Sequence, residues 1–331
     1  MSPLEKHSRI YVAGGDTPIG AALLRELDRQ GYAEIVGRPG REPDLTDAAQ
    51  LEAFFARHSP QHVFVAAGRS GGIAANRKYP AELMLDNLLL GCHLIHAAHR
   101  HGVKKLLYLA SSCSYPRQSP QPMREEYLLT GPPEPTNEAY AVAKIAGVKL
   151  CQAYRQQYGA NFITGIPANA FGPGDDFDPE NSHVIAALMR RMHEAKEAGS
   201  EAVEIWGTGS PRREFIFVDN LAEACLVAMD RYDGIEPINL GGGTDLSIKE
   251  LAHLVQEVTG FEGQIRFDAT KPDGMPVKLL DSSKLLGLGW QPRVSFADAL
   301  RATYDWFVQA VAQQKAPADT NPTDEETVFH G

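Results

Sequence analysis

Short apolar runs alternate with longer amphipathic stretches over the first half of the chain. The runs lie at residues 9–13, 34–37, 61–68, 105–110 and 161–167, and small or polar residues follow each of them. Apolar runs of this length are typical of strands buried on both faces of a sheet. Strands that alternate with helices predict an α/β fold, a Rossmann-type doubly wound parallel sheet with a smaller α/β substrate-binding domain.

Start signals and apolar periodicity mark the other expected elements. Residues 44–47 include an N-cap for a helix, and Ser247 with Glu250 forms a capping box before another. We expect further helices over 21–30, 81–101, 140–158 and 183–197. A run at 216–220 is expected to return the chain to the sheet, and 237–240 to add a strand.

Composition narrows the class of protein. The chain has 331 residues, of which 43% are hydrophobic, enough for a substantial globular core. The net charge, 32 basic minus 42 acidic residues or −10, argues against nucleic-acid binding and against docking on anionic membranes. The four cysteines are widely spaced and fit no metal site, so we expect free thiols and a cytoplasmic location. No signal core and no run of 18 apolar residues is present.

A glycine turn follows the first apolar run. Gly14 and Gly20 flank the start of a predicted helix, where free N–H groups and the helix dipole bind a pyrophosphate. The middle position is Thr17, whose Cβ restricts close approach of a phosphate. An ordinary strand–turn–helix is the alternative. After the second strand, Arg38 and Arg41 favour a 2′-phosphate and therefore NADPH, although solvated loop arginines would look the same.

The strand at 105–110 ends in Ser111, Ser112 and Cys113, at the edge of the sheet where ligands bind. Tyr140 and Lys144 follow on a helix and share one face. An ammonium group beside a phenol lowers the phenol pKa, which makes Tyr140 a proton donor and acceptor.

Longer strings in the chain resemble the GDP-L-fucose synthase family of the short-chain dehydrogenase/reductase superfamily. They are SSCSYP, EPTNEAYAVAK, NSHVIAALMRRMHEA, WGTGSPRREF and TKPDGMPVKLLD, and the resemblance covers roughly residues 8–309. It implies NADPH-dependent 3,5-epimerisation and 4-reduction of GDP-4-keto-6-deoxy-D-mannose to GDP-L-fucose.

The resemblance also implies the catalytic residues. Cys113 and His183 would supply the base and acid that move protons at C3 and C5. Ser111 and Tyr140 would hold the C4 oxygen, and Lys144 would orient the nicotinamide ribose. We also expect the pKa of His183 to be lowered, because it opens a helix.

Cofactor and substrate contacts are implied as well. Asn87 is expected to be structural or to lie beside the cofactor. The implied NADP(H) contacts are Gly14, Thr17, Ile19, Gly20, Arg38, Arg41, Ala67, Asn87, Tyr140, Lys144, Pro167, Asn169 and His183.

Guanidinium groups match a diphosphate, so Arg191 and either Arg212 or Arg213 are the candidates for it. Trp206 would contact the nucleotide or pack in a core or lid, and Lys278 would reach a phosphate or a sugar hydroxyl.

Four positions depart from the family pattern: Thr17, Ala168, Phe171 and Val277. They surround the cofactor and substrate regions, and they keep a second reading open, a 4-reductase or epimerase for a related nucleotide-linked keto sugar. A more remote alternative is a non-catalytic NADP-binding sensor.

The expected domains interleave along the chain. Residues 8–167 and about 214–243 would bind NADP, and about 168–213 and 244–312 would bind substrate. Residues 315–331, rich in Pro, Thr, Asp and Glu, are expected to be a disordered tail. Helices near 81–101 and 140–158 have more apolar positions than one core face needs. They predict a homodimer, with burial inside one subunit as the alternative.

Overall fold

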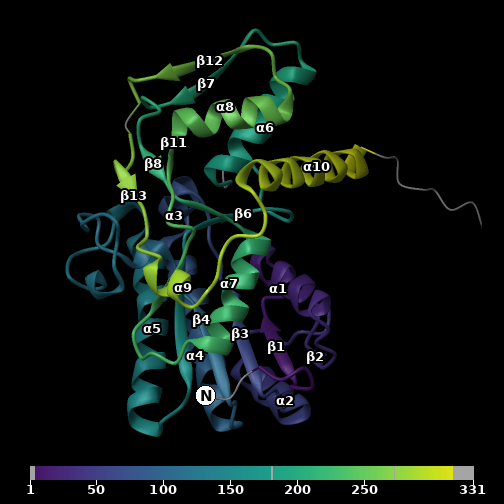
Figure 1. The fold of residues 1–331 in the computed structure, drawn as a ribbon, viewed down its shortest axis with the longest axis vertical. Helices are drawn as coiled ribbons and strands as arrows, with labels where there is room; N and C mark the ends of the chain where they lie inside the picture. Colours follow the sequence, from purple (N-terminus) through teal and green to yellow (C-terminus); the bar gives the residue numbers. More distant parts are fainter. Residues whose placement is uncertain (1–3, 180–181, 272, 316–331) are drawn as a thin grey trace, which may run out of the picture.

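The computed structural model describes residues 4–179, 182–271 and 273–315. Most of the predicted tail, residues 316–331, therefore lies outside the described residues. Figure 1 shows two stacked groups of elements, a larger one around a sheet and a smaller one above it. The exact domain boundaries stay a prediction.

The larger group is built on a six-stranded parallel sheet with strand order β10-β5-β4-β3-β1-β2. The order confirms the expected doubly wound fold. The chain runs from β1 to β2 on one side and then crosses back to β3 on the other side of β1, so a topological switch point lies between β1 and β3. The strands are β1 (Ile10–Ala13), β2 (Ile35–Val36), β3 (His62–Val65), β4 (Lys105–Leu109), β5 (Phe162–Pro167) and β10 (Ile238–Leu240).

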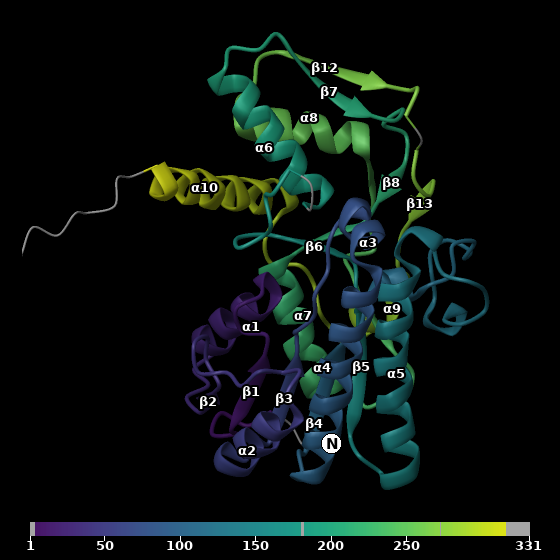
Figure 2. The same ribbon diagram turned by 180° about the vertical axis from the view of Figure 1, so that it is seen from behind.

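Helices cover both faces of this sheet. In Figure 2, α4 and α5 lie side by side in front of it, and Figure 1 shows α1 and α7 on the opposite face. Asp47 caps α2 through the N–H groups of Ala49 and Gln50. The helices are α1 (Pro18–Arg29), α2 (Ala48–His58), α3 (Ile73–Lys78), α4 (Pro80–Arg100), α5 (Glu138–Tyr158) and α7 (Val218–Arg231).

The smaller group holds short sheets and their helices. The predicted capping box of Ser247 and Glu250 is present at α8. The helices are α6 (Val184–Glu197), α8 (Ile248–Thr259) and α10 (Phe296–Lys315). Helix α9 (Ser283–Gly287) belongs to the larger group, where it packs against β10 (Figure 1). The sheets pair β7 (Ala202–Trp206) with β12 (Gln264–Asp268), and β8 (Arg212–Arg213) with β11 (Leu246–Ser247) and β13 (Val277–Lys278).

The expected return of the chain to the main sheet at 216–220 is wrong. Strand β9 (Phe215–Phe217) pairs instead with β6 (Asn169–Phe171), and Val218 already begins α7. Within the ranges that the structure describes, β10 is the one strand added to the main sheet after β5. Short 3-10 helices are η1 (Ser112–Ser114), η2 (Glu125–Tyr127) and η3 (Pro135–Asn137).

Candidate active site

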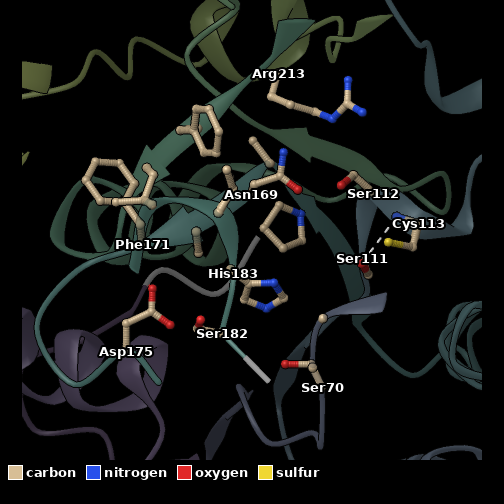
Figure 3. A pocket seen from close by; sticks show the side chains of 18 of the residues that line it. Ser70, Ser111, Ser112, Cys113, Asn169, Phe171, Asp175, Ser182, His183 and Arg213 are labelled. Carbon is tan, nitrogen blue, oxygen red and sulfur yellow. Dashed lines mark hydrogen bonds between the residues drawn. The ribbon is translucent and has the colours of Figure 1, made fainter. Parts of the chain in front are cut away.

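A pocket of about 890 Å³ lies at the carboxyl ends of β1, β3, β4 and β5, beneath the smaller group. Residues from both groups line it, and Figure 3 shows Cys113, His183, Asn169 and Arg213 around the same space. Its position at the switch point is where dinucleotides and their substrates bind in open α/β sheets.

Thr17 has a structural function that the sequence reasoning missed. Its Oγ1 accepts a hydrogen bond from the Gly20 N–H at 3.0 Å and donates one to the Gly14 carbonyl at 2.8 Å, so it is the N-cap of α1. Threonine followed by Pro18 at the first helical position is a recognisable start signal. The turn requires a glycine at position 14, because Gly14 has φ +80° and a Cβ there would lie 2.6 Å from the Ala67 Cα.

The arginines expected to select the cofactor lie outside the pocket lining. Arg38 is paired with Asp28 of α1 at 2.6 Å, and Arg41 is exposed. The carboxylate of Glu42 instead reaches the glycine turn and accepts the N–H groups of Gly15 at 3.0 Å and Gly14 at 3.3 Å. The role of the two arginines stays a prediction.

The predicted effect of Lys144 on Tyr140 is wrong for this conformation. Burial, reinforced by the nearby Cys113, raises the pKa of Tyr140, and a hydrogen bond with Ser111 only partly offsets this. Lys144 Nζ lies 5.9 Å from the Tyr140 ring centroid and donates to the carbonyls of Leu109 at 3.3 Å and Ala67 at 3.4 Å. Burial lowers the pKa of Lys144 to about 8.

Cys113 and His183 border the same pocket, as predicted from the sequence. The Cys113 N–H donates to Ser111 Oγ at 3.2 Å, which fixes the turn after β4 (Figure 3). Two nitrogen atoms approach the Cys113 sulfur: Nδ2 of Asn137 at 3.0 Å and Nζ of Lys278 at 3.4 Å.

His183 is the N-cap residue of α6, one residue before the helix begins. Its pKa is lowered, as expected, but the chief cause is burial, followed by the positive charge of Lys278, while Asp176 opposes both. Asn181, which opens the motif around His183, lies outside the described residues.

The structure distinguishes between the arginine candidates for the diphosphate. Arg191 and Arg213 line the pocket, whereas Arg212 is engaged with Asp245 at 3.0 Å and Glu250 at 3.2 Å. Neighbouring residues of a strand point to opposite faces, so only one of the pair on β8 can face the pocket.

Trp206 is also at the pocket, 65% exposed, with Lys271 Nζ 5.6 Å from the centroid of one of its rings. The alternative that it packs in a core is therefore wrong.

The remaining cofactor-side candidates surround the base of the pocket. Ile19, Ala67, Pro167 and Asn169 line it. Asn87 is buried and donates to the carbonyls of Leu83 at 2.7 Å and Arg69 at 2.8 Å, so it holds the loop after β3 in place.

The family departures at Ala168 and Phe171 also line the pocket. Phe171 packs against the rings of Phe215, Phe217 and Phe296, with centroids 5.4 to 6.4 Å away. Phe171 thus belongs to an aromatic cluster that joins β6, β9 and the start of α10.

Sequence reasoning missed three residues at or beside the pocket. Asn137 precedes Tyr140 by three residues in the EPTNEAY string, and that spacing was the available signal. Asp175 lines the pocket, and burial raises its pKa to about 7. Glu214 is buried and accepts N–H groups from Gly243 and Leu280, both at 2.8 Å. Burial also raises the pKa of Glu214 to about 7.

The donor set fits a dinucleotide. The glycine turn approaches Ala67 so closely that a side chain at Gly14 would overlap the backbone, and Asn87 Oδ1 is buried without a hydrogen-bond partner. Across the described ranges, no group of three or more His, Cys, Asp or Glu side chains is arranged to hold a metal ion. In the same ranges, no helix has the length and hydrophobicity needed to cross a membrane.

Comparisons with known proteins agree with this site. The model of the NAD dependent epimerase/dehydratase family matches residues 10–241. GDP-L-fucose synthase 1 of Arabidopsis thaliana is 53% identical over 310 residues, which span 94% of this chain and 96% of that protein.

Two solved structures have the same fold. A GDP-L-fucose synthetase from Naegleria fowleri bound to NADP has a TM-score of 0.86 at 28% identity, covering 94% of this chain and 97% of that one. A GDP-D-glycero-L-gluco-heptose synthase from Campylobacter jejuni, in the presence of NADPH, has a TM-score of 0.85 at 32% identity, covering 92% and 99%. The chain belongs to the NAD dependent epimerase/dehydratase family and, within it, to the GDP-L-fucose synthases.

Proposed function

We propose that this protein is an NADPH-dependent enzyme that converts GDP-4-keto-6-deoxy-D-mannose to GDP-L-fucose. The observation that carries the proposal is the meeting of two sets of side chains at one pocket. Ser111 and Tyr140 can hold a ketone oxygen, and Cys113 and His183 can move protons at the neighbouring carbons. The relatives named GDP-L-fucose synthase support the substrate.

The residues around the base of the pocket would hold NADP(H). Thr17 to Ile19 lie at the N-terminus of α1, and Lys144, Pro167 and Asn169 lie at the ends of neighbouring elements. The solved relatives with NADP and NADPH support this assignment. When bound, the cofactor supplies the hydride for the C4 carbonyl.

The side chains of this protein would then divide the proton chemistry. C–H bonds beside a ketone are acidic because the resulting negative charge moves to the ketone oxygen, where Ser111 and Tyr140 can donate to it. Cys113 removes the proton and His183 returns one from the other face. Tyr140 gives its proton to the same oxygen during reduction, so one oxygen-binding site serves both reactions.

The reaction in deuterated water tests the proposal. GDP-4-keto-6-deoxymannose is supplied with NADPH, NADPH consumption is followed, and deuterium at C3 and C5 of the product is read by NMR. Consumption with label at both carbons is expected. Consumption without label would leave a plain 4-reductase, and no consumption would point to another keto sugar or to the non-catalytic sensor.

We further propose a homodimer that forms through α4 and α5. These helices pack against each other, and α4 presents exposed Leu85, half-buried Leu89 and exposed Cys92 at helical spacing, with Leu85 56% exposed. Val142 and Tyr158 of α5 are exposed as well.

A cytoplasmic location is proposed from the sequence, and the four cysteines are free, as expected of a reducing compartment.

A further inference from the structure

Two nitrogen donors converge on the sulfur of Cys113 from distant parts of the chain. Asn137 Nδ2, before α5, is 3.0 Å from Sγ, and Lys278 Nζ, at the end of β13, is 3.4 Å from it. An ammonium group has only donors, and the amide nitrogen of Asn137 also donates. A neutral thiol is a weak acceptor for both, whereas a thiolate accepts both and is balanced by the lysine charge.

The positive charge of Lys278 is directed to the sulfur. Within the described part of the chain, its side chain forms its hydrogen bond with Cys113 and takes part in no ion pair. Among the described residues, the titratable groups that interact with Cys113 are Lys278 on β13 and Tyr140 on α5. Burial opposes ionisation of the thiol most strongly. The charge of Lys278 and hydrogen bonds from Ser111, Lys278 and Asn137 together outweigh burial and lower the pKa of Cys113.

The backbone around Lys278 is fixed, so its ammonium group is not a mobile surface charge. β13 pairs with β8, and the next residues are tied to the chain that follows Cys113. The Leu279 N–H donates to Gln121 Oε1 at 2.9 Å, and the Met123 N–H donates to the Leu279 carbonyl at 2.7 Å. Leu280 is held by Glu214.

We propose that Asn137 and Lys278 hold Cys113 as a thiolate and so make it the base of the epimerisation. The sulfur takes a proton from the carbon beside the ketone and becomes a thiol, and the electron pair of that C–H bond moves toward the ketone oxygen. His183 gives a proton to the same carbon from the other face. The thiol then releases its proton to solvent, and His183 takes up a proton from solvent in turn. The identity of the sugar rests on the proposed function, but the ionisation of Cys113 does not.

The test is the pH dependence of Cys113 alkylation by iodoacetamide in the full chain without substrate. A Cys92→Ser background removes the exposed thiol, Cys151 and Cys225 are buried, and peptide mass spectrometry assigns the label. Lys278→Met is expected to raise the thiol pKa by roughly one unit, which shifts the profile of alkylation rate against pH to higher pH by the same amount. Asn137→Ala should raise it less, and Lys278→Arg should keep it low. The exposed Lys249 provides the control, and Lys249→Met should change nothing.

NADPH binding by each variant reports whether it is folded. Unchanged thiol pKa values in folded Lys278→Met and Asn137→Ala would overturn the inference, even if the enzyme turns over the sugar. If the variants raise the thiol pKa but the enzyme rejects GDP-4-keto-6-deoxymannose, the proposed substrate fails and the thiolate inference stands. With an active enzyme, Lys278→Met should also slow deuterium entry at C3 and C5 at pH 7, with recovery at higher pH.

Discussion

Tyr140 holds its proton through the neutral range because burial and the neighbouring Cys113 raise its pKa. A phenol in this state is an acid ready for the ketone oxygen. Tyr140→Phe should therefore slow NADPH oxidation by about 10²- to 10⁴-fold, the usual contribution of a positioned acid, and leave NADPH binding intact. Steady-state rates and a binding titration measure both. Tyr158→Phe, on the exposed end of α5, is the control, and a fully active Tyr140→Phe would exclude this role.

His62 makes stability depend on pH. It is buried in β3, its ring nitrogens have no hydrogen-bond partner, and burial, with Lys104 and Lys105 nearby, lowers its pKa from 6.5 to about 4. The unfolded chain therefore binds the extra proton, and stability is lost as pH falls from about 6.5 toward 4. The loss from His62 between pH 7.5 and 5 is about 2 kcal/mol.

His62→Leu should remove this component. Urea unfolding of both proteins at pH 7.5 and 5 gives the measurement, and the variant should lose less stability on acidification. The variant is compared with the wild type because Glu214 and Asp175 also respond to pH. Their pKa values are raised, so the stability that they contribute is lost as pH rises, which is the opposite direction. An equal acid sensitivity of the two proteins would contradict the assignment.

Among the elements, the turn at Gly243, the residues that follow β13 and the end of β8 are joined by one carboxyl group. Glu214 accepts the N–H groups of Gly243 and Leu280, so it fixes the strand that carries Lys278. Glu214→Ala leaves these buried donors unpaired and should lower the unfolding free energy by about 2 kcal/mol or more. Glu214→Gln retains one acceptor and should lose less. Urea titrations measure both, and equal stability of Glu214→Ala and wild type would contradict this role.

Element-level prediction succeeded where local chemistry decides the outcome. Residues close together in the sequence determine the apolar runs of the main sheet, the Asp47 cap and the Ser247 capping box. The run at 216–220 misled because an apolar pattern does not identify the strand's partner, and β9 pairs with β6. The site shows the same limit. Sequence placed Cys113 and His183 together, but the burial of Tyr140 and the partners of Lys144 and Lys278 depend on packing between distant segments.

For the whole molecule, the exposed apolar stripe on α4 predicts the assembly. Leu85→Asp places a charge in the proposed dimer interface and should convert the protein to a monomer, because burying an unpaired carboxylate is unfavourable. Light scattering after size exclusion measures the mass. Leu286→Asp, on exposed α9, is the control and should leave the mass unchanged. A wild-type monomer, or a dimeric Leu85→Asp variant, would exclude this interface.

The exposed indole of Trp206 at the pocket allows ligand binding to be followed by tryptophan fluorescence. The chain has three tryptophans: Trp290 is 3% exposed, Trp306 lies on α10 against Phe177, and Trp206 stands at the pocket in water. Filling the nucleotide end of the pocket would remove water from Trp206 and leave the other two unchanged. In a titration without NADPH, its emission therefore reports occupancy by the GDP portion, so nucleotide-sugar binding can be measured apart from the reaction.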